Sequence, residues 1–374
     1  FAGNKVFNKP LNSWNTANVT NMEGMFRENI AFNQDISNWN TGNVKNMRYM
    51  FMMTKLFNQP LNSWDTANVT DMEAMFRENR IFNQPLNNWS TGNVKNMRYM
   101  FQQAVFNQNI NSWNTGNVTE MGSMFRNAIT FNQPLNNWNT GKVTHMNIMF
   151  ANATAFNQNI NSWNTHKMQY MENMFSGATA FNQNINSWNT HKVQHMAFMF
   201  YDATSFNHSL SSFRINAVIN MHNMLKGCGM NCQNLSKTLN SWNVQAAALN
   251  KNNINLGNLD VSQTYNERGR DAITALKARG WTINGGTFFS GCGILTTSQY
   301  ISEWDMSKQV SPNRPDATTT LITNLVGNNF IVEWENLNDP TDNGSINIAT
   351  GTPTNPFKPP TRSEERRVGK ECRS

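Results

Sequence analysis

A repeat of 25 residues constrains the fold of this chain more than any other feature. A clear copy is FNQPLNSWDTANVTDMEAMF at residues 57–76, and the phenylalanine that opens it recurs nine times. Successive copies are 25 residues apart, except for one step of 24 residues. The opening residues are Phe7, Phe32, Phe57, Phe82, Phe106, Phe131, Phe156, Phe181 and Phe206. Self-similarity at a fixed period of this length is typical of a solenoid, in which each repeat forms one coil of a stack.

The other apolar positions of the repeat recur at the same period, so stacked coils would place each one beside its counterpart. In the copy at residues 57–76 these positions are Leu61, Trp64, Val69, Met72, Met75 and Phe76. One such unit buries too little apolar surface to offset the entropy lost on ordering it, so stability must come from neighbouring coils. We therefore assign the methionines to the core, although thioether sulfur also suits soft metals such as Cu(I).

Within a coil, the segments 61–64 and 69–72 are both candidate strands, and the pattern leaves open which of them forms the continuous sheet. The spacing of three and four residues from Met72 to Asn79 favours a short helical turn. The sequence thus predicts an α/β solenoid of about nine coils, with short parallel strands and short helical turns.

Asparagine and glutamine carry much of the polarity of this chain, in which only 14% of residues are charged. One asparagine follows the opening phenylalanine in every repeat, at Asn8, Asn33, Asn58, Asn83, Asn107, Asn132, Asn157, Asn182 and Asn207. A stacked amide can hydrogen-bond the backbone of its own turn and of the next coil, where donors and acceptors otherwise lack partners. We predict an asparagine ladder here in preference to ligand contact.

The motif FNQPLNSWDTANVTDMEAMF resembles the repeat of bacterial surface proteins and Mycoplasma-type surface lipoproteins, relatives of the BspA-like leucine-rich repeats. The resemblance covers Phe1 to about Leu225, since nearly every position of the motif recurs nine times. It implies a leucine-rich-repeat-like solenoid displayed outside the cell, with adhesion or protein binding as the usual role. It implies no catalytic residues.

Changes in composition divide the chain into four segments. Residues 1–225 are the nine-repeat solenoid, 226–286 a degenerate repeat with a helical C-terminal cap, and 287–361 a linker and the start of a truncated β-rich module. Residues 362–374 resemble a translated sequencing adapter and are set aside. In the cap, LNSWNV at 239–244 matches half a repeat, and segment 266–281 predicts a helix that Asn266 caps and Gly280 ends. In the third segment, NNFIVEWENL at 328–337 is strand-like.

Outside the adapter-like tail the chain has three cysteines, Cys228, Cys232 and Cys292. Three are too few for a disulfide framework, and a local bridge or plain burial are both open for them. No signal peptide or transmembrane run is visible. The chain starts at Phe1 in the middle of the pattern, so we expect both ends to be ends of a fragment.

Basic residues and histidines give the clearest surface signal of the array. They fall into two groups, Lys–Arg pairs two coils apart and a column of lysines with histidines beside two of them. The candidate surface contacts are Lys45, Arg48, Lys95, Arg98, Lys142, His166, Lys167, His191 and Lys192. Such a surface can attract an anionic glycan or a membrane surface, although charged residues outside a solenoid are commonly only solvated.

Neither a metal nor a cofactor is expected. His166 and His191 occupy the same position in adjacent coils, but no acidic or cysteine ligand accompanies them. His145 and His195 lie two coils apart, which is too far for one ion. The few acidic residues are scattered, so paired groups for general acid–base catalysis are missing, and no nucleophile motif or phosphate-binding loop occurs.

We therefore expect an extracellular or cell-surface repeat protein that acts by binding, in adhesion or protein–protein interaction, and that is not an enzyme. A glycan-binding array on a cell surface is the alternative. The partner would be a protein or glycan on another cell or in the matrix, bound by a monomeric array without direct membrane insertion. Nucleic acid is not expected, because the sequence has no dense basic stripe with aromatic platforms.

Overall fold

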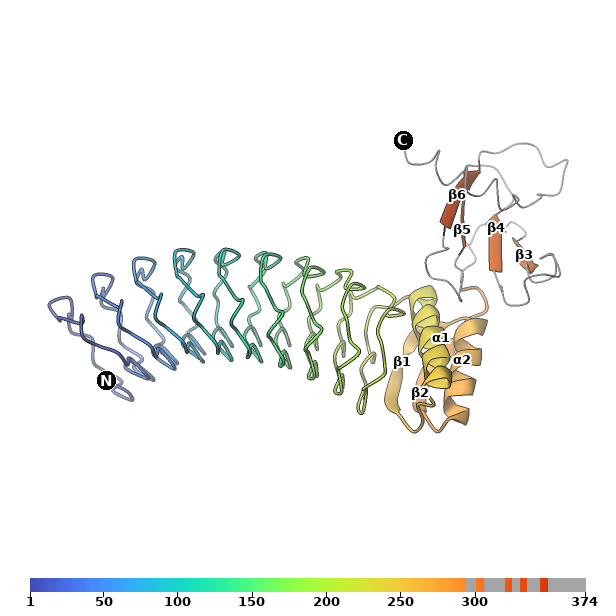
Figure 1. Cartoon of the computed structure of the whole chain (residues 1–374), viewed down its shortest axis with the longest axis horizontal. Coiled ribbons are helices and arrows are strands. Elements are labelled where there is room, and N and C mark those ends of the chain that lie inside the picture. The colour runs from blue at the N-terminus through green and yellow to red at the C-terminus, as the bar shows by residue number, and fades with distance from the viewer. Residues whose placement is uncertain (293–300, 306–319, 325–329, 335–343, 349–374) are drawn as a thin grey trace. The chain divides into compact units, whose positions relative to one another are not determined.

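The nine repeats form nine successive coils, each hydrogen-bonded to the next, in the computed structural model of the chain (Figure 1). The structure describes residues 1–292 and, beyond them, the backbone of four strands at 301–305, 320–324, 330–334 and 344–348. Residues 1–293 form one compact unit and residues 294–374 another, and each is described by itself. We number the coils by their opening phenylalanines, so coil one begins at Phe7 and coil nine at Phe206.

Each coil pairs with the next through one parallel bridging residue. The bridging residues are Asn21, Asn46, Asp71, Asn96, Glu120, His145, Tyr170, His195 and Asn220. Asp71 lies within the candidate segment 69–72, so this segment and not 61–64 carries the pairing between coils. Further backbone bonds follow it: the N–H of Met47 donates to Asp71 at 3.0 Å and that of Tyr49 to Glu73 at 2.9 Å. We call the surface that this column of residues forms the bridging face.

The segment after each bridging residue is a run of turns with two residues in the left-handed region of the backbone. In coil three these are Ala74 and Glu78, with φ of 53° and 59°. N–H groups alternately donate within the coil, as from Met75 to Met72 at 3.3 Å, and to the next coil, as from Ala74 to Arg98 at 2.8 Å. Left-handed backbone costs a residue other than glycine about 1–2 kcal/mol. The interlocking hydrogen bonds offset that cost.

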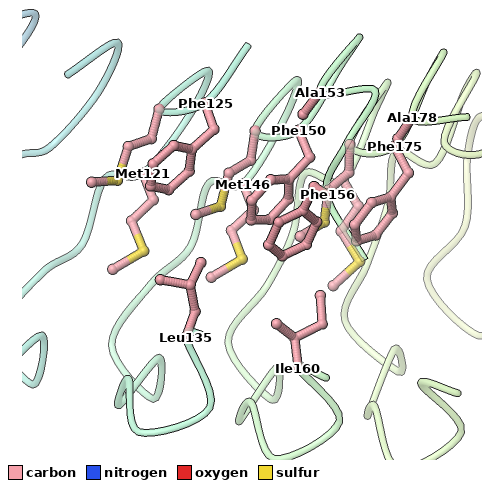
Figure 2. Packing of buried hydrophobic residues seen from close by; sticks show 14 of the residues in the cluster. Met121, Phe125, Leu135, Met146, Phe150, Ala153, Phe156, Ile160, Phe175 and Ala178 are labelled. Carbon is pink, nitrogen blue, oxygen red and sulfur yellow. The ribbon is translucent and has the colours of Figure 1, made fainter. Parts of the chain in front are cut away.

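The apolar files pack as continuous stacks inside the coils. Figure 2 shows Phe125, Phe150 and Phe175 at the same position of three consecutive coils, with ring centroids 5.5 and 5.7 Å apart. Met121 and Met146 lie beside them and are fully buried, so the methionines pack in the core as the sequence predicts.

The tryptophan file adds a polar link between coils. From coil two to coil eight, each indole N–H donates to the carbonyl of the leucine or isoleucine in the preceding coil, as from Trp64 to Ile36 at 3.1 Å. A buried N–H that finds an acceptor avoids the penalty of an unpaired donor. These hydrogen bonds fix the register between coils, in addition to the stabilisation that apolar burial provides.

The predicted asparagine ladder is confirmed. The side-chain oxygen of Asn33 accepts from the backbone N–H of Asn58 at 3.1 Å, and that of Asn58 from Asn83 at 3.0 Å. The same bond recurs at every step from Asn8 to Asn207. A glutamine that follows the asparagine often joins it, as Gln59 does by donating to Asn33 at 3.0 Å.

Two helices and two strands follow coil nine, in the order α1 (Cys232–Ala248), β1 (Asn255–Tyr265), α2 (Glu267–Ala278) and β2 (Thr282–Phe288). β1 and β2 are parallel neighbours. β1 continues the pairing of the stack, because the N–H of Asn223 in coil nine donates to Leu256 at 2.8 Å. α1 contacts the other side of coil nine, where Gln245 donates to the carbonyl of Phe213 at 3.0 Å. These elements thus cover the last apolar face.

The helix predicted at 266–281 is α2, and the side chain of its N-cap Asn266 accepts from Gly269 at 3.1 Å. The segment 239–244, in contrast, is not a half-repeat in conformation, because it lies within α1. Asn231 caps that helix, and the run Gln245–Ala248 has high helix propensity. These local signals outweigh the tendency of LNSW to form the turn that it forms in the coils.

In the second unit, β3 (Ile301–Asp305) pairs antiparallel with β4 (Thr320–Asn324), and β5 (Phe330–Trp334) with β6 (Gly344–Ile348). β5 lies within the predicted strand at 328–337. The adapter-like residues 362–374 lie outside the described residues. None of the helices that the structure describes is long and apolar enough to cross a membrane.

Candidate ligand-binding groove

The bridging face is hollowed over coils four to eight. The hollow has a volume of about 590 Å³ and is lined by Arg98, Glu120, His145, Asn147, Ile148, Tyr170, Glu172, Asn173, Ala197 and Phe198. We call it the groove. It runs from coil to coil, so each coil contributes side chains from the same few positions of the repeat.

Three positions of the repeat supply the nine lining residues beyond coil four. The first is the bridging residue, as in Tyr170, and the second lies two residues later, as in Glu172. The residue between them, Met171, points into the core, as expected for alternating sides of an extended segment. The third position comes directly after the second, as in Asn173, and its left-handed backbone keeps its side chain on the bridging face.

Two bulky residues occupy that left-handed position in the groove. Ile148 has a φ of 63° and Phe198 a φ of 57°. Left-handed backbone is rare for large and β-branched side chains and costs on the order of 1–3 kcal/mol at such sites. Both residues line the groove, and the left-handed conformation itself belongs to every coil, as at Tyr49 and Tyr99.

A stack of three rings runs from coil six to coil eight, and two of the rings, His145 and Tyr170, line the groove. The centroid of Tyr170 lies 4.7 Å from that of His145 and 5.2 Å from that of His195, with the planes within 9° and 11° of parallel. Both faces of the tyrosine ring are therefore covered by imidazoles. A ligand in the groove therefore meets the edge of the Tyr170 ring and not its face.

Each outer imidazole contacts a carboxylate. Nδ1 of His145 lies 3.2 Å from Glu120, and Nδ1 of His195 lies 3.6 Å from Glu172. Burial raises the pKa of Glu172, and its own backbone N–H and the two histidines counteract this only in part. The groove therefore holds two part-buried carboxylates, each in contact with a histidine.

Coils two to four carry a different arrangement on the same face. Arg48 lies 2.8 Å from Glu73 and 3.7 Å from Asp71, and Asn96 donates to Glu73 at 3.0 Å. Burial raises the pKa of Asp71, while hydrogen bonds and Arg48 act in the opposite direction. Here the partner of the carboxylates is a permanent cation, Arg48, so their negative charge has a positive partner on the same part of the face.

The structure separates the nine residues that the sequence analysis selected into two sets. Arg98 lines the groove, Arg48 belongs to the ion-pair network, and Lys45 and Lys95 are exposed one residue before the bridging column. The other set lies on the turn after the buried threonine of coils six to eight and comprises Lys142, His166, Lys167, His191 and Lys192. The two sets do not form one surface.

The lysine column replaces a second ladder of asparagines. In the earlier coils an asparagine at this position donates to the preceding coil, as Asn68 does to Gly42 at 2.6 Å. Lys142 instead donates to the side chain of Asn117 at 2.6 Å. His166 and His191 each contact an asparagine of their own turn at 2.6 Å. Within the described residues, no three His, Cys, Asp or Glu side chains are grouped so that they could hold a metal ion.

Sequence reasoning missed Tyr170, Glu172, Phe198 and Glu120 as groove residues. They occupy variable positions of the repeat, which give no periodic signal. One signal was available: a ring occupies the bridging position in coils six to eight, as His145, Tyr170 and His195. It could not be used without knowing that three separate positions share one face.

A family model described as "Mycoplasma protein of unknown function, DUF285" matches three overlapping stretches, residues 1–86, 79–176 and 133–239. Together these matches span the nine coils and the first part of α1. No curated protein and no solved structure matches the chain.

Proposed function

The chain belongs to the family described as Mycoplasma protein of unknown function, DUF285, and from this premise we propose that it is a binding protein that acts outside the cell or at its surface. Its role is adhesion or another protein–protein interaction, and it is not an enzyme. The groove in the bridging face is the observation that carries the proposal. The coils act as the scaffold, a leucine-rich-repeat-like solenoid that holds side chains of consecutive repeats in one row.

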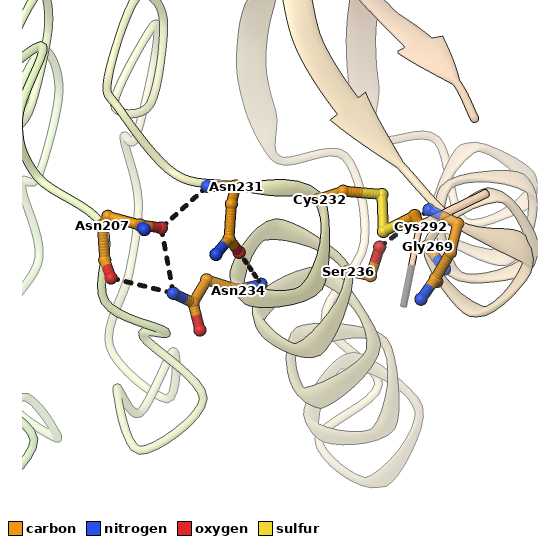
Figure 3. Close-up of a disulfide and its surroundings, with 8 residues drawn as sticks. Asn207, Asn231, Cys232, Asn234, Ser236, Gly269 and Cys292 are labelled. Carbon is orange, nitrogen blue, oxygen red and sulfur yellow. Dashed lines mark hydrogen bonds between the residues drawn. A yellow bond between two sulfur atoms is a disulfide. The ribbon is translucent and has the colours of Figure 1, made fainter. Parts of the chain in front are cut away.

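A disulfide supports the extracellular location. Cys232 at the start of α1 is bonded to Cys292, which follows β2 (Figure 3). Structural disulfides persist in oxidising compartments and are rare in the cytosol. Cys228 is buried, and burial raises its pKa to about 11, so this thiol stays protonated and does not compete for the bond.

The chemistry of the groove suits a protein segment better than a sugar chain. Sugar rings are commonly held against the free face of an aromatic side chain, and both faces of Tyr170 are covered by His145 and His195. What remains are ring edges, two carboxylates, the amides of Asn147 and Asn173, and the apolar side chain of Phe198. This mixture of hydrogen-bonding groups and apolar contacts is typical of protein interfaces.

A glycan-binding array remains the second candidate, and the lysine column favours it. Lys142, Lys167 and Lys192 stand in consecutive coils where asparagines bond the coils elsewhere. Like charges at that spacing repel one another. An anionic glycan that runs along the column would offset that repulsion.

Binding of the full chain to an array of extracellular proteins and to an array of glycans separates the two candidates. In the groove, Asn147→Arg is a mild substitution, because arginine occupies this repeat position at Arg48 and Arg98. We expect it to abolish binding to protein. The matched control Glu23→Arg changes the same position in coil one and should leave binding unchanged. The second candidate would be supported if the chain bound only anionic glycans and if that binding were lost in a triple variant with asparagine at Lys142, Lys167 and Lys192.

A further inference from the structure

The carboxylates of the groove differ from the other carboxylates of the same face in their partners. Glu73 and Asp71 contact Arg48, a cation at every physiological pH. Among the described residues, the ion-pair contacts of Glu120 and Glu172 are to His145 and His195. Histidine side chains in general carry little charge above about pH 7. The two carboxylates of the groove therefore form no ion pair with a permanent cation among the described residues, although Arg98 lines the coil-four end of the groove.

The two carboxylates are also withdrawn from water. The side chain of Glu120 is 31% exposed and that of Glu172 is 26% exposed. Desolvation disfavours the charged form of a carboxyl group, and an opposite charge nearby reverses the effect. The raised pKa of Glu172 agrees with this imbalance. A cation supplied by a ligand would restore the balance.

We propose that the groove binds an extended basic segment of a protein partner, with one lysine or arginine side chain held by Glu120 and another by Glu172. The inference rests on the proposed function and names the partner chemistry of the same site. Carboxylates make their strongest hydrogen bonds to such cations. Phe198 and Ile148 supply apolar contacts for the neighbouring residues of the segment.

Arg98 gives the groove a direction. It is the basic residue of the lining and lies at the coil-four end, where it donates to the hydroxyl of Tyr99 at 3.1 Å. The carboxylates come from coils five and seven. Positive charge at one end and negative charge further along favour a segment whose basic side chains lie away from Arg98.

The same geometry makes binding sensitive to acid. When His145 and His195 are protonated, they form ion pairs with Glu120 and Glu172 and compete with the ligand. The groups that face His145 are Glu120, Tyr170 and Glu172; those that face His195 are Tyr170 and Glu172, with His222 on the neighbouring coil. The charged groups among these are carboxylates, so protonation of either histidine closes a pair inside the groove.

The inference can be tested with a random display library of twelve-residue peptides, from which binders to the full chain are selected. Peptides that also bind the Asn147→Arg protein are removed, because they bind outside the groove. We expect selected peptides to be enriched in lysine and arginine. The affinity of these peptides for the double variant Glu120→Gln, Glu172→Gln should be at least tenfold lower than for the unsubstituted protein. Their affinity for the unsubstituted protein should also fall at least tenfold between pH 7.5 and pH 5.5. In His145→Asn with His195→Asn the loss on acidification should disappear. Asparagine is the bridging residue of four other coils, so this variant keeps the fold.

Peptides without basic enrichment, or affinity unchanged in the double glutamine variant, would overturn the inference. So would a library that yields no peptide dependent on the groove. The proposed function would survive each of these results if Asn147→Arg still abolished binding on the protein array. It would fail with the inference only if that substitution left protein binding intact.

Discussion

The side-chain oxygen of Asn207 accepts a hydrogen bond from the backbone N–H of Asn231 at 2.8 Å. Asn207 is the last asparagine of the ladder, and Asn231 is the N-cap of α1, where its own side chain accepts from Asn234 at 2.9 Å. Asn234 in turn donates to Asn207 at 3.0 Å, as the glutamines do in the coils (Figure 3). The ladder thus passes directly into the helix cap, which joins the coils to the elements that end the stack.

Removing one rung should destabilise the stack. Asn132 accepts from the N–H of Asn157 at 3.0 Å and from Gln158 at 2.9 Å. Asn132→Ala leaves both part-buried donors without this acceptor, which costs roughly 1–3 kcal/mol. Urea unfolding of the full chain, followed by tryptophan fluorescence, measures the loss. Thr154→Ala is the control, because Thr154 is exposed and its bond to Ile129 is long at 3.5 Å. Equal stability of the two variants would contradict a structural ladder.

How far the sequence predicted this structure depends on which positions repeat. Residues such as Phe131 and Asn132 recur in every coil, so period alone assigned them to the core and the ladder. The groove is formed by Tyr170, Glu172 and Phe198, which do not recur. These residues share a face because one position of the repeat has a left-handed backbone. Residues of many types adopt that conformation there, so residue type does not predict it.

The tetrapeptide LNSW shows a second limit. At residues 61–64 it forms a turn, in which the N–H of Trp64 donates to Leu61 at 3.1 Å, and at 239–242 it lies within α1. Leu61, Trp64, Leu239 and Trp242 are all buried. Both conformations place Leu and Trp on one side, since a spacing of three suits a turn and a helix alike. The flanking residues decide between them.

Relieving the strain at Ile148 should stabilise the protein. Asparagine occupies the same left-handed position at Asn173 and Asn223 and tolerates it better than a β-branched residue. The change in the free energy of unfolding caused by Ile148→Asn should therefore be about 1 kcal/mol more favourable than that caused by the same substitution elsewhere. The matched control is Ile129→Asn, at a residue that is 57% exposed and outside the left-handed region. The two melting temperatures measure the difference, and a lower value for the Ile148 variant would refute stored strain.

Deleting a whole coil should leave a folded protein. Removal of residues 57–81 takes out coil three and joins its neighbours in register, and the groove in coils four to eight stays intact. Because each coil contacts only adjacent coils, the loss amounts to one unit and one interface. Removal of residues 57–68 puts every file out of register and should abolish cooperative unfolding. Circular dichroism during heating distinguishes the two outcomes, and similar curves for both deletions would rule out nearest-neighbour stacking.

The disulfide should stabilise the end of the stack. It joins Cys232 to Cys292 across a sequence separation of 60 residues that includes α1, β1, α2 and β2. Closing a loop of that length in the unfolded chain is worth about 4 kcal/mol in the chain-entropy account. Cys232→Ser with Cys292→Ser should expose the segment 249–292 to protease, with the coils still protected. Cys228, which is buried and contacts Gln263, should remain unlabelled by iodoacetamide in the protein with the disulfide intact. Equal protease resistance would show that packing alone secures these elements.

The charge of Glu172 in the groove should lower the free energy of unfolding at neutral pH. Burial raises its pKa in the folded protein, so its contribution is favourable below the unfolded pKa, about 4.3, and is lost as the pH rises through the folded value. Glu172→Gln removes the charge, and its melting temperature should exceed that of the unsubstituted protein at pH 7.5 and match it near pH 4. Glu23→Gln, at the same repeat position in coil one, is exposed and should change neither value. A lower melting temperature for Glu172→Gln at pH 7.5 would mean that the contact with His195 stabilises the fold by more than burial costs, and the carboxylate would then need no cation from a ligand.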